Sequence, residues 1–281
     1  MPASASPASA TRAAEGAGAR RTPAIASMTT PALSLTPLPG LPAIRPGDDL
    51  AALIAASLER AGLVLADGDV LAVTQKIVSK AEGRQRRLAD VQPSARAQAL
   101  AAETRKDPRL VELILQESQA ILRTRPDLLI AEHRLGIVLA NAGIDRSNLG
   151  GDDETVLLLP EDPDASAARL RQALQQVSGA TLGVIITDSV GRAWRRGTVG
   201  IAIGTAGVAP FADLRGRQDL AGRPLQVSEI APADSLAAAA VLVMGEAAEG
   251  WPVVLLRGAG GGGADTPARV VLRPRAEDLF R

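Results

Sequence analysis

The sequence predicts an α+β fold in which mixed sheets are combined with helices. Two short apolar runs, VLAVT at 70–74 and TVLLLP at 155–160, are typical of buried strands. Longer stretches, such as 162–179, repeat apolar residues at helical spacing. Strands and helices follow one another irregularly, and the sequence has no repeat of fixed period. A regular winding of parallel βαβ units is therefore not expected.

Ordered structure is expected to begin near Pro37. Residues 1–36 begin with a long stretch rich in Ala, Ser, Pro and Gly and are interpreted as a disordered N-terminal extension. Residues 37–281 are expected to form one domain, either undivided or built from two α+β subdomains. The first helix should begin after Asp48 or Asp49, either of which can cap it, and its apolar stripe consists of Leu50, Leu53, Ile54 and Leu58.

Turn and capping residues divide the remaining chain into elements. After the strand at 70–74, the segment from Gln75 to Arg84 is expected to open into a loop. The later predicted elements are helices at 93–106 and 108–126 (capped near Asp107, with Pro108 in the first turn), a strand pair at 128–143, the strand at 155–160, a helix at 162–179 closed by Gly179, a strand from 181 ending in a polar loop, a helix at 233–250, and strands at 251–258 and 268–274.

Composition excludes several classes of function. The 31 basic residues balance the 31 acidic ones, so no net field would attract nucleic acid or an anionic membrane. The chain has no cysteine, which excludes disulfides and thiolate chemistry and fits a reducing cytoplasm. No apolar run approaches the roughly 18–20 residues that span a bilayer. A cytoplasmic protein without nucleic-acid or membrane partners is expected.

Familiar nucleotide-binding and catalytic signals are missing. The sequence contains no G-x-x-x-x-G-K-[ST], so a bound nucleotide would not be held by a P-loop. GAGGGG at 258–263 fits G-x-G-x-x-G formally, but no helix is predicted after it to receive a pyrophosphate, and it is interpreted as a linker. The single histidine, His133, cannot form a histidine-based metal cluster and is assigned a structural role.

Three polar motifs offer acidic side chains after apolar segments. They are NAGIDRSN at 141–148, with Asp145 and Asn148; IITDSVGR at 185–192, with Asp188 and Ser189 at a strand end; and MGEAAEG at 244–250, with Glu246 and Glu249. Carboxylate and hydroxyl oxygens are the ligands that hard divalent cations prefer. For each acid taken alone, the capping of a turn or helix is the more common role.

Two arginine-rich segments supply cationic side chains. GRAWRRG at 191–197 carries Arg192, Arg195 and Arg196, and DLRGRQDLAGR at 213–223 carries Arg215 and Arg217. Guanidinium groups suit carboxylate and phosphate recognition, so a weak assignment as sites for substrate anions follows. A solvated basic loop is the alternative for both segments.

Ordered motifs from about residue 38 to residue 258 together resemble the F420 γ-glutamyl ligase family, whose members join L-glutamate to coenzyme F420-0. The motifs that carry the resemblance are GLPAIRPGDDLAALI, DGDVLAVTQKIVSKAEGR, NAGIDRSN, LLLPEDPDASAARLR, GVIITDSVGRAWRRGTVGIAIGTAGV, DLRGRQDLAGRPL and ADSLAAAAVLVMGEAAEGWPVVLLRG. The resemblance implies a GTP-dependent ligase that uses Mn²⁺ or Mg²⁺ as two divalent ions, with K⁺ in some members. It also implies an α+β subunit in an intertwined homodimer.

The resemblance also implies the residues of the site. Lys80 and Asp188 are expected to be catalytic, and the expected metal ligands are Asp145, Asp188, Ser189 and Glu246. The expected contacts to GTP are Gly40, Leu41, Pro42, Ala43, Gln75, Lys80, Asn148, Met244, Gly245, Glu246, Ala247, Ala248, Glu249, Gly250 and Trp251.

The mechanism implied agrees with the residue chemistry. Scattered carboxylates and a hydroxyl would hold two divalent ions against a triphosphate without a P-loop. A substrate carboxylate would attack the γ-phosphate in line to give an acyl phosphate, which the amine of glutamate then displaces. The arginine-rich segments would bind the anionic partners, F420-0 and glutamate.

Two other functions stay open on the sequence. One is a non-catalytic protein that binds a nucleotide or F420, and the other is a glutamate ligase acting on another small acid. A purely structural role is disfavoured by the polar motifs at strand ends.

Lysine usage singles out one segment. The chain contains only three lysines among its 31 basic residues, and two of them, Lys76 and Lys80, lie four residues apart. A compact ammonium on a flexible stem differs from a guanidinium fork in how it reaches a phosphate. Lys80 is assigned to the phosphates, whereas Lys76 is expected to share the neighbourhood without a role of its own.

Overall fold

Five strands form the central sheet of the computed structural model, which describes residues 32–146 and 154–279. Their order is β1 (Ser34–Pro37), β12 (Val253–Arg257), β2 (Val70–Thr74), β8 (Gly183–Arg192) and β9 (Arg195–Ala206). Only β2 and β8 run parallel, and every other neighbouring pair is antiparallel. The sheet is therefore mixed, as the irregular order of elements predicted.

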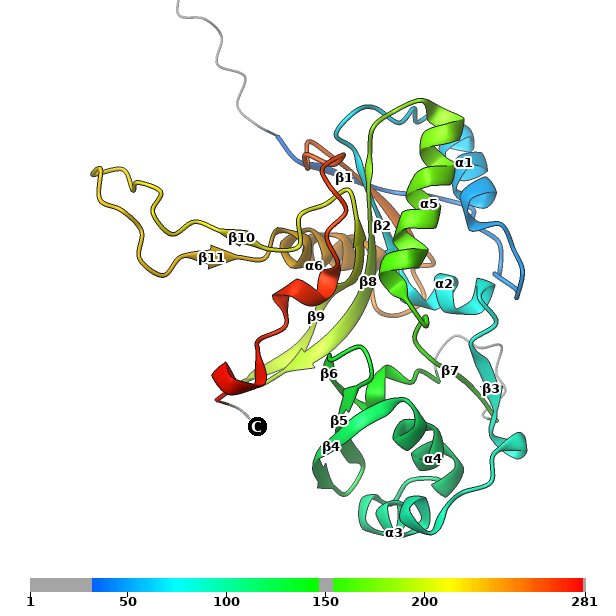
Figure 1. Cartoon of the computed structure of the whole chain (residues 1–281). Coiled ribbons are helices and arrows are strands. Elements are labelled where there is room, and N and C mark those ends of the chain that lie inside the picture. The colour runs from blue at the N-terminus through cyan, green and yellow to red at the C-terminus, as the bar shows by residue number, and fades with distance from the viewer. Residues whose placement is uncertain (1–31, 147–153, 280–281) are drawn as a thin grey trace, which may run out of the picture. The chain divides into compact units, whose positions relative to one another are not determined.

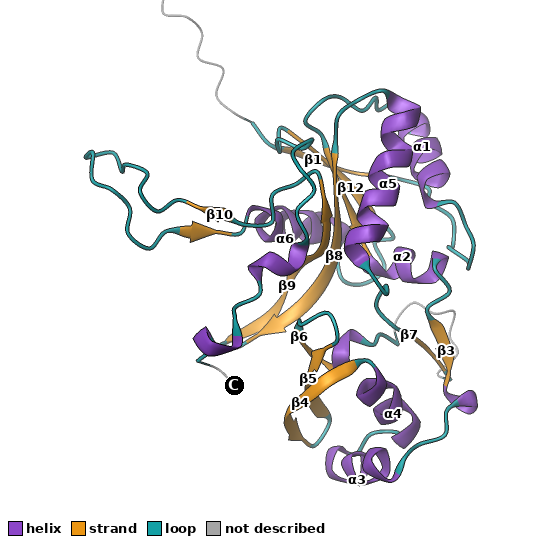
Figure 2. Cartoon of the chain, in the orientation of Figure 1, coloured by secondary structure: helices purple, strands orange, loops and turns teal. Residues whose placement is uncertain are grey.

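Helices cover both faces of this sheet (Figure 2). On β2, Leu71 and Val73 join the core beneath α1 (Leu50–Arg60) and α5 (Pro163–Ser178). The alternate residues, Val70 and Ala72, join a second core against α6 (Pro232–Met244). Because side chains alternate along a strand, an apolar strand such as VLAVT can supply both cores at once.

The capping predictions for two helices are confirmed. The Asp49 carboxylate accepts a hydrogen bond from the Ala52 amide at the start of α1. Gly179 ends α5 in the left-handed conformation, with φ of 73°. Both signals are local, and so they could be read without knowledge of the tertiary packing.

A further set of elements forms a lobe with its own apolar core. These elements are β3 (Gln85–Arg87), η1 (Leu88–Asp90), α3 (Ala95–Thr104), α4 (Pro108–Gln116), β4 (Ser118–Arg125), β5 (Leu128–His133), β6 (Val138–Ala140), η2 (Asn141–Gly143) and β7 (Thr155–Leu157). Strands β4, β5 and β6 form an antiparallel sheet, and β3 pairs with β7. Despite its separate core, the lobe belongs to the same compact unit as the central sheet.

Several sequence-based expectations are wrong in their extent. The predicted helix at 108–126 ends at Gln116, and Ser118–Arg125 is a strand because it pairs with β5 across a turn in which Asp127 has positive φ. The predicted last strand at 268–274 is instead the short 3-10 helix η3 (Ala268–Val271), followed by η4 (Arg275–Glu277). Ordered structure also begins before Pro37, since Ser34–Pro37 already pairs with β12.

The expected loop after β2 is a helix. Residues Gln75–Ala81 form α2, which starts directly after Thr74 and ends before Gly83. The segment QKIVSKA contains neither glycine nor proline, and Ile77 and Val78 are buried on one side of it. Lys76 and Lys80 are consequently one helical turn apart.

A long arm leaves the central sheet between β9 and α6 (Figure 1). It contains the two-residue strands β10 (Ala212–Asp213) and β11 (Glu229–Ile230), which pair with each other. Its apolar side chains Leu220 and Val227 are exposed.

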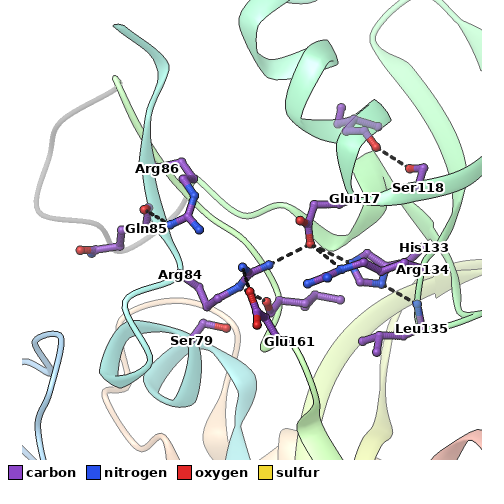
Figure 3. Close-up of polar contacts among 12 residues, drawn as sticks. Ser79, Arg84, Gln85, Arg86, Glu117, Ser118, His133, Arg134, Leu135 and Glu161 are labelled. Carbon is purple, nitrogen blue, oxygen red and sulfur yellow. Dashed lines mark hydrogen bonds and ion pairs between the residues drawn. The ribbon is translucent and has the colours of Figure 1, made fainter. Parts of the chain in front are cut away.

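A buried ion-pair network joins the lobe to the segments that border the central sheet (Figure 3). The Glu117 carboxylate contacts Arg84 at 3.0 Å, Arg134 at 3.2 Å and the Nε2 atom of His133 at 3.4 Å. Arg84 also donates to Glu161 at 2.8 Å. His133 therefore lies in a structural network.

Within the described residues, no helix is long and apolar enough to cross a membrane.

Candidate functional site

A cavity of about 490 Å³ lies where α2, β8 and the segment after α6 meet. Its walls come from five stretches that are far apart in the sequence. They are Leu41–Ile44, the end of β2 with α2 (Thr74, Lys76, Ile77, Lys80), the middle of β8 (Thr187, Asp188, Ser189), the last turn of α6 (Val241, Met244) and Gly245–Pro252. The volume falls within the usual range for small-molecule sites.

Asp188 and Ser189 reach the cavity from within a strand. The expectation that a strand ends at Asp188 is wrong, because β8 continues to Arg192 in a long hairpin with β9. The pairing shifts by one residue beside Thr187, where β9 accommodates an extra residue. Such a bulge changes the direction of neighbouring side chains and is common near functional sites.

Three carboxylates from distant segments influence one another in this region. Burial raises the pKa of Asp188 to about 7, and the negative charges of Asp145 and Glu246 act in the same direction. A hydrogen bond from the Ser189 amide and the positive charge of Lys76 oppose this rise in pKa. The tertiary fold therefore brings all three predicted acidic motifs together around Asp188. A positive charge among these carboxylates would reduce their mutual repulsion.

The donor atoms fit a hard divalent cation. Three carboxylates and the Ser189 hydroxyl supply oxygen, the ligand type preferred by Mg²⁺ and Mn²⁺. The Ser189 hydroxyl donates to Glu246 Oε2 at 3.1 Å, so two of the predicted ligands are already in contact. Across residues 32–146 and 154–279, no three acidic or histidine side chains lie close enough together to form a metal site.

Both lysines of α2 line the cavity. The Nζ atom of Lys76 is 2.8 Å from Asp145 Oδ2. Burial lowers the pKa of Lys80, and repulsion by Lys76 adds to this effect, whereas Asp145 opposes it. The expectation that Lys76 shares the neighbourhood of Lys80 is confirmed, but its ion pair with Asp145 was not expected, because the segment was predicted to be a loop. Helical spacing would have placed both lysines on one face.

Some of the predicted nucleotide contacts line the cavity and others do not. Leu41, Pro42 and Ala43 line the cavity, as does the whole stretch from Met244 to Trp251. Gly40 and Gln75 do not line it: the Gly40 carbonyl accepts from Arg60 at 2.8 Å, and the buried Gln75 side chain accepts from the Ser79 hydroxyl at 3.0 Å. Asn148 lies outside the described residues.

Gly245 shapes the loop after α6. Its φ is 75°, which is strained for other residues, and a Cβ atom there would collide with the Glu249 carboxylate. That carboxylate accepts from the Ala247 amide at 2.9 Å. The turn of the loop over the cavity thus depends on a glycine at this position.

None of the five arginines assigned to substrate anions lines this cavity. Arg192, Arg195 and Arg196 lie exposed at the tip of the β8–β9 hairpin, and Arg192 donates to the Gly197 carbonyl. In the arm, Arg217 is exposed and Arg215 makes a 2.6 Å ion pair with Asp213. The assignment of these arginines to substrate anions stays a prediction.

Comparison with known proteins identifies close relatives. The family model described as F420-0:gamma-glutamyl ligase matches residues 40–258. Proteins named coenzyme F420:L-glutamate ligase align with most of the chain. The one from Methanothermobacter thermautotrophicus is 47% identical over 251 residues, covering 89% of this chain and 99% of the relative.

Two further relatives of the same name give similar values. The protein from Methanopyrus kandleri is 48% identical over 255 residues, covering 89% of this chain and 98% of the relative. The protein from Archaeoglobus fulgidus is 44% identical over 245 residues, covering 87% and 95%. The resemblance carried by the sequence motifs is confirmed.

Proposed function

Because the chain belongs to the F420-0:gamma-glutamyl ligase family, we propose that it joins L-glutamate to a carboxylate of coenzyme F420-0 at the expense of GTP. The proposal includes an acyl-phosphate intermediate and a place in coenzyme F420 biosynthesis. The relatives that support it are named for ligation of L-glutamate to coenzyme F420, and they align over nearly their whole lengths.

The observation that carries the proposal is the charge arrangement of the cavity. Lys76 and Lys80 line it together with Asp188 and Glu246, and Asp145 is paired with Lys76 at 2.8 Å. A nucleoside triphosphate with its divalent ions needs both kinds of charge, cations for the phosphates and carboxylates for the ions. Gly245–Trp251 and Leu41–Ala43 supply the other walls, in which Leu41, Pro42 and Trp251 offer apolar surface for the rest of the nucleotide.

The proposed metal ligands are Asp145, Asp188, Ser189 and Glu246. Two Mn²⁺ or Mg²⁺ ions would supply charge neutralisation and alignment of the phosphates, and K⁺ is proposed as an additional ion. Lys80, with a pKa lowered by burial, would place its ammonium on a phosphate oxygen. The cavity walls would exclude water, so that glutamate rather than water meets the acyl phosphate.

We also propose that the protein is a homodimer. The arm from 212 to 230 exposes Leu220, Val227 and Ile230, and a second subunit would cover such apolar side chains. Light scattering coupled to gel filtration measures this directly. We expect twice the chain mass for the unaltered protein and a shift toward the monomer for Leu220→Asp with Val227→Asp.

The enzymatic proposal is tested with purified protein, F420-0, L-glutamate, GTP and Mn²⁺. Mass spectrometry should show F420-0 gaining one or more glutamyl units, with GDP and phosphate formed in step. ATP in place of GTP tests the nucleotide preference. Nucleotide binding without any product would favour a non-catalytic binding protein, and turnover only with another acid would redirect the acceptor assignment.

A further inference from the structure

We propose that Lys76 is an internal counter-ion that holds Asp145 in the metal-free protein and is displaced when a divalent cation binds. Metal binding would then release the Lys76 ammonium toward the phosphates of the nucleotide. This inference rests on the divalent ion of the proposed function. It gives Lys76 a positioning role that links the metal site to the nucleotide site.

The first support is the direct ion pair. The Lys76 Nζ atom lies 2.8 Å from Asp145 Oδ2, and the exposed fractions of the two side chains are 30% and 20%. Both groups have therefore lost much of their hydration, and their attraction is less screened than that of a surface pair. An ammonium in this position competes for the same carboxylate oxygen that a divalent cation would bind.

The second support is that the backbones of both residues are held by the fold. Asp145 exchanges two backbone hydrogen bonds with Leu157, at 2.9 and 2.8 Å. The helix that carries Lys76 is held by the burial of Gln75, Ile77 and Val78. The proposed exchange involves the Asp145 carboxylate and the Lys76 ammonium, which are the two groups of the ion pair.

The third support is the position of Lys80. It lies one turn from Lys76 on the same helix, and both line the cavity. An ammonium displaced from Asp145 would lie near a second ammonium and be repelled unless an anion lay between them. A triphosphate is such an anion. Metal and nucleotide should therefore strengthen each other's binding, and Lys76 carries part of this coupling.

The test is a Mn²⁺ titration of nucleotide-free protein, in which electron paramagnetic resonance measures the concentration of free Mn²⁺ at each point. Lys76→Gln removes the competing charge but keeps a side chain of similar length. We expect it to bind Mn²⁺ roughly three- to tenfold more tightly than the unaltered protein. A non-hydrolysable GTP analogue should then tighten Mn²⁺ binding by a smaller factor in this variant than in the unaltered protein.

Matched variants separate charge from other effects. Lys106→Gln removes the only other lysine of the chain outside α2, and Lys76→Arg keeps the positive charge; neither should bind Mn²⁺ more tightly. Lys76→Met is a second neutral variant if Lys76→Gln folds poorly. In unaltered protein labelled with ¹³C at lysine Cε, one signal is expected for each of the three lysines. Mg²⁺ should shift the Lys76 signal and leave that of Lys106 in place.

The outcomes distinguish this inference from the proposed function. No Mn²⁺ binding by the unaltered protein, with or without the GTP analogue, would remove the metal from the proposed function. Normal Mn²⁺ binding that is equal or weaker in the neutral Lys76 variants would overturn the counter-ion role and leave the ligase proposal standing. A Lys76 signal unmoved at saturating Mg²⁺ would overturn it in the same way.

Discussion

Asp188 shows most directly how a single residue joins stability to function in this protein. Burial and two neighbouring carboxylates raise its pKa to about 7, so its charged form is costly in the absence of cations. We predict that Asp188→Asn lowers glutamylation on the order of a hundredfold or more, while the metal-free protein stays folded with an unchanged or higher melting temperature. Product formation and thermal unfolding are measured on the same preparation. Near-normal turnover would contradict a role for this carboxylate.

The second residue-scale prediction concerns Lys80. Its ammonium lines the cavity and is partly buried, and a guanidinium in its place is broader and cannot approach as a point charge. Lys80→Arg should therefore raise the KM for GTP roughly tenfold, the effect of about 1.4 kcal/mol in binding. Lys106→Arg is the matched control and should leave the KM for GTP unchanged. An equal effect in both variants would point to a general change in charge.

At the scale of an element, the loop after α6 depends on the backbone of Gly245. Its φ is 75°, and a Cβ atom would meet the Glu249 carboxylate. We predict that Gly245→Ala destabilises the protein by about 1–3 kcal/mol and weakens GTP use, because the loop that lines the cavity is displaced. Urea unfolding and GTP kinetics measure the two effects.

Gly250 in the same loop is the matched control for Gly245. Its φ is 74°, but a Cβ atom added there would meet no neighbouring atom within 4 Å among the described residues. Gly250→Ala should show only the backbone cost, about 1 kcal/mol, and a smaller change in GTP use. Equal effects at the two positions would show that contact with Glu249 does not matter.

At the scale of the whole molecule, the network around Glu117 joins the lobe that carries Asp145 to the segments beside the central sheet. Burial alone would raise the pKa of Glu117, but the hydrogen bond from His133 and the charges of Arg84 and Arg134 outweigh it and hold the pKa below its usual value. Glu117→Gln removes the buried carboxylate partner of Arg84 and leaves only the exposed Glu161. We predict a loss of about 2–4 kcal/mol in unfolding free energy at pH 7.

The pH dependence follows from the direction of the Glu117 shift. Since the folded pKa lies below the unfolded one, near 4.5, the stabilisation is complete above pH 4.5 and is lost as pH falls through the folded pKa. The difference between Glu117→Gln and the unaltered protein should therefore narrow in acid, as urea unfolding at pH 7 and pH 4 would show. Glu154→Gln, at the exposed partner of Arg109, is the control and should cost under about 1 kcal/mol. A constant difference between the two pH values would contradict this account.

The sequence by itself determined the signals that act over a few residues and the motifs that define the family. The Asp49 cap, the Gly179 stop and the apolar strand at 70–74 are local, and the ordered motifs matched the family over residues 40–258. Tertiary structure decided what depends on partners distant in the chain. Ser118–Arg125 is a strand because β5 pairs with it, whereas 268–274 forms no strand because no neighbouring strand within the described ranges receives it.

The candidate site shows the same division. Residue types and motif order identified Asp145, Asp188 and Glu246, because a carboxylate that follows an apolar segment can be recognised in the sequence alone. Their approach to one another, and the ion pair that places Lys76 on Asp145, result from packing α2, β8 and the lobe together. Contacts between segments separated by many residues are set by the burial of the cores around them. No local pattern in the sequence encodes how close two such segments lie in space.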